Sequence, residues 1–144
     1  MELDWNPWLV RTMGWPYAFR QTPWDVIRSF LGGMANAHPQ FRHMVAIVDS
    51  VLASGTSELL AGCTSMHDLL VVPTPIPEPP YDVVAVRAPG SLREPAAGFV
   101  RIEHLTTTGR NDQIDRPVAE AVPLFWRFII EKYGIEPPHA GEHS

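Results

Sequence analysis

Cys63, His67 and Asp68 are residue types that could together form a nucleophilic catalytic site. A cysteine nucleophile needs an imidazole that takes its proton and a further group that orients the imidazole. The four-residue separation of Cys63 and His67 falls in a predicted strand and turn, and this spacing alone does not bring the side chains together. Since buried free cysteine is common packing material, the sequence favours a structural role for Cys63, with catalysis as the alternative.

His104 is the second candidate for catalysis. In the sequence it shares one face of a predicted strand with Val100 and Ile102, and it stands at the end of that strand beside a polar loop. A histidine on an apolar face is usually a hydrogen-bonded core residue. At the floor of a pocket, however, it could titrate and act as a general base.

The segment 106–116, which reads TTTGRNDQIDR, is the densest run of hydrogen-bonding side chains in the chain. We predict a loop here that could grip an anion or a carboxylate beside a helix N-terminus, with candidate ligand-binding residues Arg110, Asn111, Asp112 and Arg116. The spacing matches neither a P-loop nor an EF-hand. The histidines form no HExxH motif, so the sequence predicts no metal site and no cofactor.

Tryptophans supply the candidate contacts with a partner. Trp5, Trp8 and Trp15 fall in an aromatic, proline-punctuated N-terminal arm over residues 1–21, and Trp126 falls in the last predicted helix. Aromatic side chains in such an arm either close the protein's own core or anchor a partner, because tryptophan is favoured in interfaces.

Composition excludes several classes of function. The net charge of −5 and the scattered arginines disfavour nucleic-acid binding, which needs clustered cations. The longest aliphatic run has four residues, far short of a membrane span, and no signal peptide is visible. A single cysteine fits a reducing cytoplasm. Ten arginines against one lysine are typical of GC-rich coding sequences, and we expect a bacterial source.

The elements that must position these residues begin with a helical hairpin. Thr22 as N-cap and Pro23 at the first helical position open one helix, which Gly32-Gly33 weakens or ends. Pro39 opens a second helix with apolar residues at three- and four-residue steps, and Gly55 closes it.

Four short strands are predicted to follow, because the apolar period changes to two. They span 58–63, 69–72, 81–87 and 99–106; a turn at 65–68, a Pro-rich connector at 73–80 and a loop at 88–98 join them. The continuous apolar run in the third strand indicates a central position. Asp115 is predicted to cap a last helix that Pro123 kinks and Gly134 ends.

We therefore predict an α+β fold in which an N-terminal helical hairpin and a C-terminal helix pack on a roughly four-stranded, mostly antiparallel sheet. Residues 1–136 form one domain, and 137–144 a flexible tail. The leading functional hypothesis is a small acidic cytosolic protein that binds a protein partner, as an adaptor, inhibitor or immunity-type factor, or that forms a homodimer. The alternative is a small-molecule-binding protein or enzyme with a pocket between sheet and helices, around His104 and the 106–116 loop.

Overall fold

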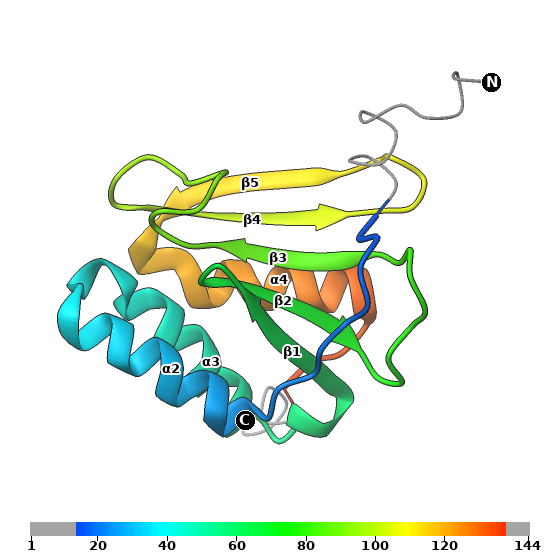
Figure 1. Cartoon of the computed structure of the whole chain (residues 1–144), viewed down its shortest axis with the longest axis horizontal. Helices are drawn as coiled ribbons and strands as arrows, with labels where there is room; N and C mark the ends of the chain where they lie inside the picture. Colours follow the sequence, from blue (N-terminus) through cyan, green and yellow to red (C-terminus); the bar gives the residue numbers. More distant parts are fainter. Residues whose placement is uncertain (1–13, 138–144) are drawn as a thin grey trace.

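The computed structural model describes residues 14–137, and within this range three α-helices cover one face of a five-stranded antiparallel sheet (Figure 1). The predicted α+β class is confirmed, with one strand more than expected. The strands follow each other in chain order across the sheet: β1 (Leu60–Ser65), β2 (Asp68–Pro73), β3 (Val83–Arg87), β4 (Phe99–Leu105) and β5 (Asp112–Pro117). The helices are α2 (Trp24–Ala37), α3 (Arg42–Ser54) and α4 (Ala121–Tyr133).

The fifth strand corrects the prediction of a polar loop over 106–116. Only 106–111 form the loop; residues from Asp112 onward pair with β4, so that Asp112 lies opposite His104 and Asp115 opposite Arg101. Asp115 therefore belongs to a strand and does not cap a helix. An edge strand leaves one side without a partner strand, and in β5 Ile114 is the one apolar side chain before Pro117. Hydrophobic periodicity was therefore too weak to reveal it.

The helical hairpin forms as predicted, with different ends. Helix α2 starts at Trp24 after Pro23, and the backbone of Thr22 pairs with Gly62 of β1, so Thr22 does not cap the helix. Gly32-Gly33 does not end α2, which continues to Ala37. Helix α3 ends where predicted, at Gly55, whose φ of 80° is the left-handed conformation that glycine adopts readily.

Helix α4 begins six residues later than Asp115 and follows a 3-10 turn over Val118–Glu120. Pro123 consequently lies in its first turn, where the backbone N–H that proline lacks has no partner within the helix. Pro123 therefore does not interrupt the hydrogen bonding of α4, and the predicted cause of a kink is absent. The helix ends at Gly134, as predicted, again with a left-handed conformation at φ 69°.

The two faces of the sheet are covered differently. The helices cover one face, which is buried from β1 to β4 and only partly covered at β5, and the main core lies between helices and sheet. On the opposite face a smaller apolar cluster covers β1 to β3, where it packs against Trp15 and Phe19 of the N-terminal strap, defined here as residues 14–22. Because both faces of β3 are covered, all five of its residues are buried, which agrees with its predicted central position. Beyond the strap, the same face over β4 carries Arg101 and Glu103.

Candidate functional site

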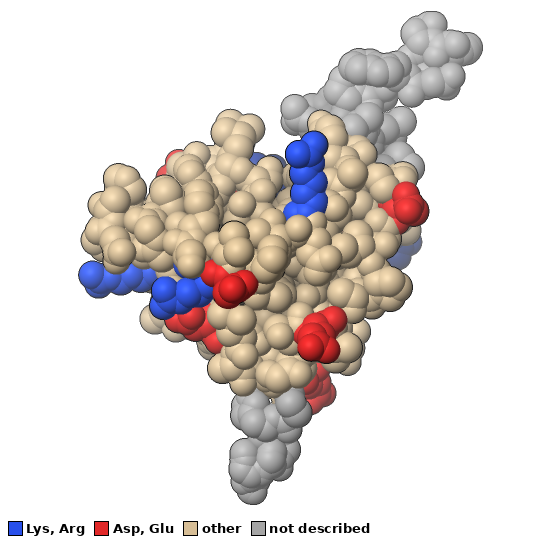
Figure 2. Space-filling view, turned by 60° about the horizontal axis from the view of Figure 1, so that its bottom comes forward, with Lys and Arg blue, Asp and Glu red and all other residues tan. Residues whose placement is uncertain are grey.

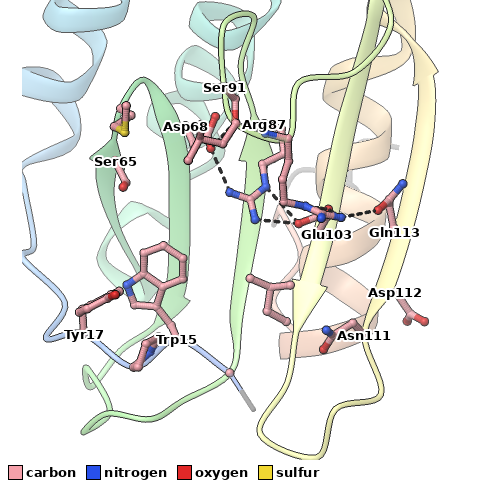
Figure 3. Close-up of a pocket in the computed structure, with 16 residues that line it drawn as sticks. Trp15, Tyr17, Ser65, Asp68, Arg87, Ser91, Glu103, Asn111, Asp112 and Gln113 are labelled. Carbon is pink, nitrogen blue, oxygen red and sulfur yellow. Dashed lines mark hydrogen bonds and ion pairs between the residues drawn. The ribbon is translucent and has the colours of Figure 1, made fainter. Parts of the chain in front are cut away.

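A cavity of about 740 Å³ lies on the sheet face that the helices do not cover, next to the strap (Figure 3). Its floor is formed by β2 and β3 with Asp68 and Arg87, and one wall by Trp15 and Tyr17 of the strap. The end of β4 with Glu103 and the start of β5 form the opposite wall. The 88–98 loop borders one end through Ser91, Leu92 and Arg93. This volume is within the range of cavities that enclose small molecules.

Arg87 occupies the centre of the floor because the antiparallel register places it between two buried carboxylates. Its Nη1 donates to Asp68 Oδ2 at 2.9 Å, while Nε and Nη2 donate to Glu103 Oε1 at 3.0 and 2.8 Å. The Arg87 and Glu103 side chains are 10% and 2% exposed. These charges are far from bulk water, so each depends on its partner for stabilisation.

The same carboxylates anchor the 88–98 loop. Asp68 Oδ1 accepts the backbone N–H of Ala88 at 2.7 Å, and its Oδ2 accepts the Ser91 hydroxyl at 2.9 Å. Arg93 Nε donates to Glu103 Oε2 at 2.8 Å, and its Nη2 donates to Gln113 Oε1 at 3.0 Å. The result is an alternating chain of two carboxylates and two guanidinium groups that joins β2, β3, β4, β5 and the loop.

The strap forms the aromatic side of the cavity. Trp15 exchanges backbone hydrogen bonds with Tyr81, at 2.8 and 3.3 Å, and the Tyr81 hydroxyl donates to the Tyr17 carbonyl at 2.9 Å. The Trp15 and Tyr17 rings pack edge to face, 5.8 Å apart. Gly14, next to Trp15, has φ of 87°, and a Cβ there would lie 2.6 Å from the Tyr81 carbonyl oxygen. Glycine is therefore required where the strap meets the sheet.

Three exposed apolar side chains stand around the cavity. Tyr17, Met66 and Leu92 are 66%, 72% and 92% exposed, and all three contribute to its lining. They come from the strap, the β1–β2 turn and the 88–98 loop. Large apolar side chains that gather around a hollow favour contact with a ligand or a partner over simple solvation.

No family model matches this sequence, and the comparisons with curated proteins and with solved structures gave no match.

The arrangement around Cys63 does not form a nucleophilic site. Cys63 lies under the strap, where burial raises the pKa of its thiol and disfavours the reactive thiolate. His67 points elsewhere: its ring stacks on Phe30 of α2 and contacts Phe41. Asp68 lies on the cavity floor and is held by Arg87 and Ser91. The three residues that the sequence grouped together thus have three separate environments.

His104 lies on the helix-covered face of the sheet and does not line the cavity. It is 8% exposed and its ring packs edge to face on Tyr133 of α4, 6.3 Å away. Burial lowers the pKa of His104, and nearby Lys132 acts in the same direction, whereas Asp82 opposes them. The prediction that Val100, Ile102 and His104 share a face is correct. That face packs against helix α4, and His104 does not line the cavity described above.

The predicted loop residues divide between the cavity and the surface. Asn111 and Asp112 border the cavity, but the Asp112 carboxylate points away from it (Figure 3). It pairs with Lys132 of α4 on the helix-covered face, and this contact lowers the pKa of the Asp112 carboxyl. Arg110 is exposed outside the cavity. Arg116 donates to the Asp115 carbonyl and lies 3.8 Å from Glu120. The structure therefore brings two of these four residues to the cavity, and only the Asn111 side chain is turned toward it.

The tryptophans predicted to contact a partner lie in different parts of the structure. Trp15 forms a wall of the cavity, whereas Trp126 is 8% exposed in the main core and donates its Nε1 hydrogen to Ser50 Oγ at 2.9 Å. Trp5 and Trp8 lie outside the described residues.

Four residues of the cavity were not predicted as site residues from the sequence: Arg87, Ser91, Arg93 and Glu103. One signal was present: Arg87 ends a strand that is otherwise apolar, and Glu103 alternates with the core residues of β4. A charged residue in such a position needs a buried partner of opposite charge. Which carboxylate meets which arginine depends on strand register, which the sequence did not define.

Three further properties of the described residues concern metal-binding groups, membrane-spanning helices and surface charge. Within residues 14–137 no group of three or more His, Cys, Asp or Glu side chains is placed to hold a metal ion. None of the described helices is long and apolar enough to cross a membrane. On the face drawn in Figure 2, the basic side chains are few and are interspersed with acidic and uncharged residues.

Proposed function

We propose that this protein binds a small molecule in the cavity on the open face of the sheet. The observation that carries the proposal is the cavity itself, about 740 Å³ in volume. It lies beside the buried charges of Asp68, Arg87 and Glu103 and has tryptophan and tyrosine on one side. Pockets that bind small molecules combine apolar walls with a few fixed polar groups, as this one does. The proposal keeps the sequence-based idea of a ligand pocket but moves it to the face opposite His104.

Binding is favoured over catalysis by the state of the acidic groups. All oxygens of Asp68 and Glu103 already accept hydrogen bonds from Arg87, Arg93, Ser91 or the backbone. A carboxylate that acts as a general base needs a free lone pair within reach of the substrate proton. These groups instead fix the shape and polarity of the floor.

The test is a fragment screen on the full chain by protein-observed NMR. We expect some fragments to cause saturable shifts in the amide signals of the cavity floor and in the indole signal of Trp15. The proposal fails if no fragment in a library of several hundred compounds, each at about 1 mM, shifts these signals in a saturable manner.

A cavity-filling variant distinguishes binding in the cavity from binding elsewhere. Ser65 lies at the end of β1 and lines the cavity. Ser65→Trp places an indole in the hollow and should weaken binding of cavity fragments at least tenfold. The matched control is Glu94→Trp, which adds the same ring at an exposed position that does not line the cavity. If both variants bind equally well, the ligand site lies elsewhere.

A second candidate function, binding of a protein partner, is supported by the exposed apolar side chains Tyr17, Met66 and Leu92. In this case the cavity would receive one side chain of the partner, and the apolar residues around it would exclude water. Leu92→Glu tests this alternative. It should abolish capture of a partner from lysate. Binding of small fragments in the cavity should weaken only slightly, because Leu92 is 92% exposed.

A further inference from the structure

In the cavity, most side-chain acceptors already take part in hydrogen bonds within the protein, whereas some donors do not. The acceptors on its floor are occupied: Asp68 and Glu103 accept from two arginines, a serine and a backbone N–H. Gln113 Oε1 also accepts from Arg93. Because a guanidinium group donates hydrogen bonds and never accepts them, the oxygens in these contacts must be the acceptors. A ligand therefore finds few free acceptors among the floor side chains.

Arg87 and Asn111 both have donors available to a ligand. Arg87 has five N–H bonds, of which the hydrogen bonds to Asp68 and Glu103 use three. Figure 3 shows the terminal edge of its guanidinium group turned into the cavity on the side of Trp15. Asn111 Oδ1 accepts the backbone N–H of Thr106 at 2.8 Å, which assigns the amide NH₂ to the other side. In Figure 3 this NH₂ group faces the cavity.

The charges around these donors are balanced. Arg87 and Arg93 neutralise Asp68 and Glu103. Two further pairs border them, Arg101 with Asp115 and Lys132 with Asp112. An anion in the cavity would add an uncompensated charge beside two buried carboxylates, and a cation would meet two guanidinium groups and few free acceptors. A neutral acceptor satisfies the free N–H groups without disturbing this balance.

The aromatic wall adds a requirement for shape. Trp15 stands across the cavity from Asn111 and borders the space in front of Arg87 (Figure 3). Leu105 also lines this space and is half-buried. An indole and an aliphatic side chain in the same hollow favour a flat, apolar group between them.

We infer that the ligand is an uncharged molecule with a carbonyl or amide oxygen attached to a flat apolar ring. Its oxygen accepts hydrogen bonds from Arg87 and Asn111, and its ring lies against Trp15. This inference rests on the proposed function and adds the ligand class, which the existence of a cavity does not define.

Three probes of nearly the same shape test the ligand class on the full chain: benzamide, benzoate and benzamidine, which are neutral, anionic and cationic at pH 7. Titrations followed by NMR give the dissociation constant of each. We expect benzamide to bind at least fivefold more tightly than benzoate and at least tenfold more tightly than benzamidine, which has no acceptor oxygen. Tighter binding of benzoate would overturn the neutrality of the ligand, and tighter or equal binding of benzamidine would overturn the role of the donors.

A variant of Asn111 tests the second donor. Asn111→Asp keeps an oxygen for the Thr106 N–H but replaces the NH₂ group by an acceptor. It should raise the dissociation constant of benzamide at least fivefold. Arg110→Ala is the matched control, since it makes the same change in net charge at an exposed neighbour outside the cavity. We expect it to change the benzamide constant less than twofold. Equal effects of both variants would overturn the contact with Asn111.

The outcomes separate this inference from the proposed function. If other fragments bind in the cavity and none of the three probes does, the ligand class is wrong and the binding function stands. If no fragment of any class shifts the cavity signals, both are wrong.

Discussion

Glu103 accepts hydrogen bonds from two arginines while its side chain is 2% exposed, which makes it the residue most dependent on its neighbours. Removing one member of a buried ion pair leaves the other charge desolvated and unpaired, and this costs far more than the pair contributes as a whole. Exposed pairs behave differently, because water solvates the partner that remains. The structure contains both kinds, so the two can be compared in one protein.

Glu103→Gln should therefore lower the free energy of unfolding by about 3–5 kcal/mol, since it leaves Arg87 without its main counter-charge. Urea denaturation at pH 7 measures this change. Glu131→Gln is the control: Glu131 pairs with Arg127 on the surface, with both side chains more than half exposed. Its expected cost is below about 0.5 kcal/mol. Similar losses in the two variants would contradict the structural role given to Glu103.

His43 of α3 gives the stability a dependence on pH. Its Nε2 is buried and has no hydrogen-bond partner among residues 14–137. Burial lowers the pKa of His43 to about 4, although a hydrogen bond with the Gln40 backbone opposes the shift. The folded protein then binds this proton less readily than the unfolded chain, where the pKa is about 6.5. The contribution of neutral His43 to the free energy of unfolding is complete above pH 6.5 and is lost as the pH falls toward 4.

Between pH 7.5 and 5.0 this one group should lower the free energy of unfolding by about 2 kcal/mol. His43→Leu removes the titrating group and should make the decrease over this interval smaller by that amount. Urea denaturation of both proteins at the two pH values is the measurement. His104, whose pKa is also lowered, stays in both proteins and cancels in the comparison. Equal decreases would show that His43 does not titrate as described.

Tyr133 links the last element of the chain to the middle of the sheet. Its hydroxyl donates to the Val71 carbonyl of β2 at 2.8 Å and accepts the Val84 N–H of β3 at 3.1 Å. These two residues form the last pair in the β2–β3 register, so the hydroxyl completes the ladder where the strands separate. Helix α4 is thus attached to the sheet by polar contacts as well as by its apolar side chains.

Tyr133→Phe leaves two backbone groups without their partner and should lower the free energy of unfolding by about 1–3 kcal/mol. Thermal or urea denaturation measures the loss. Tyr17→Phe removes a hydroxyl from a side chain that is 66% exposed and should have almost no effect. A loss of stability that is equal in both variants would rule out the proposed attachment.

The sequence predicted those elements whose residues carry strong local signals. Gly55 and Gly134 identified two helix ends, and the apolar run of β3 gave its central position, because these depend on local conformation and burial. Strand β5 was missed since its single apolar residue, Ile114, produces no alternation. The cavity was missed because Arg87 and Glu103 are 16 residues apart and meet only through strand register.

At the scale of the whole molecule, the order of the strands sets the distribution of stability. Strand β3 is paired on both sides and covered on both faces. Among the strands of residues 14–137, β5 is paired only with β4, and all its residues are exposed or half-buried. Backbone amides in the centre of a sheet exchange only by global unfolding, while those at an edge exchange by local opening.

Hydrogen exchange should therefore show the amides of β3 as the slowest in the chain, with protection equal to the global free energy of unfolding. The amides of β5 that bond to β4 should exchange at least tenfold faster. Exchange followed by NMR in the native state measures both sets. If β5 is protected as strongly as β3, the edge must be covered by something other than β4, such as a second copy of the chain.

The strap also affects the order in which the protein folds. Every strand pairs with the one before it in the chain, so the sheet can grow from short-range hairpins, whereas the bond between Tyr81 and Tyr17 joins residues 64 positions apart. Contacts of long sequence separation close slowly because more chain entropy is lost before they form. The aromatic wall of the cavity is therefore expected to assemble last, and a refolding intermediate would have its helices and sheet in place before it could bind ligand.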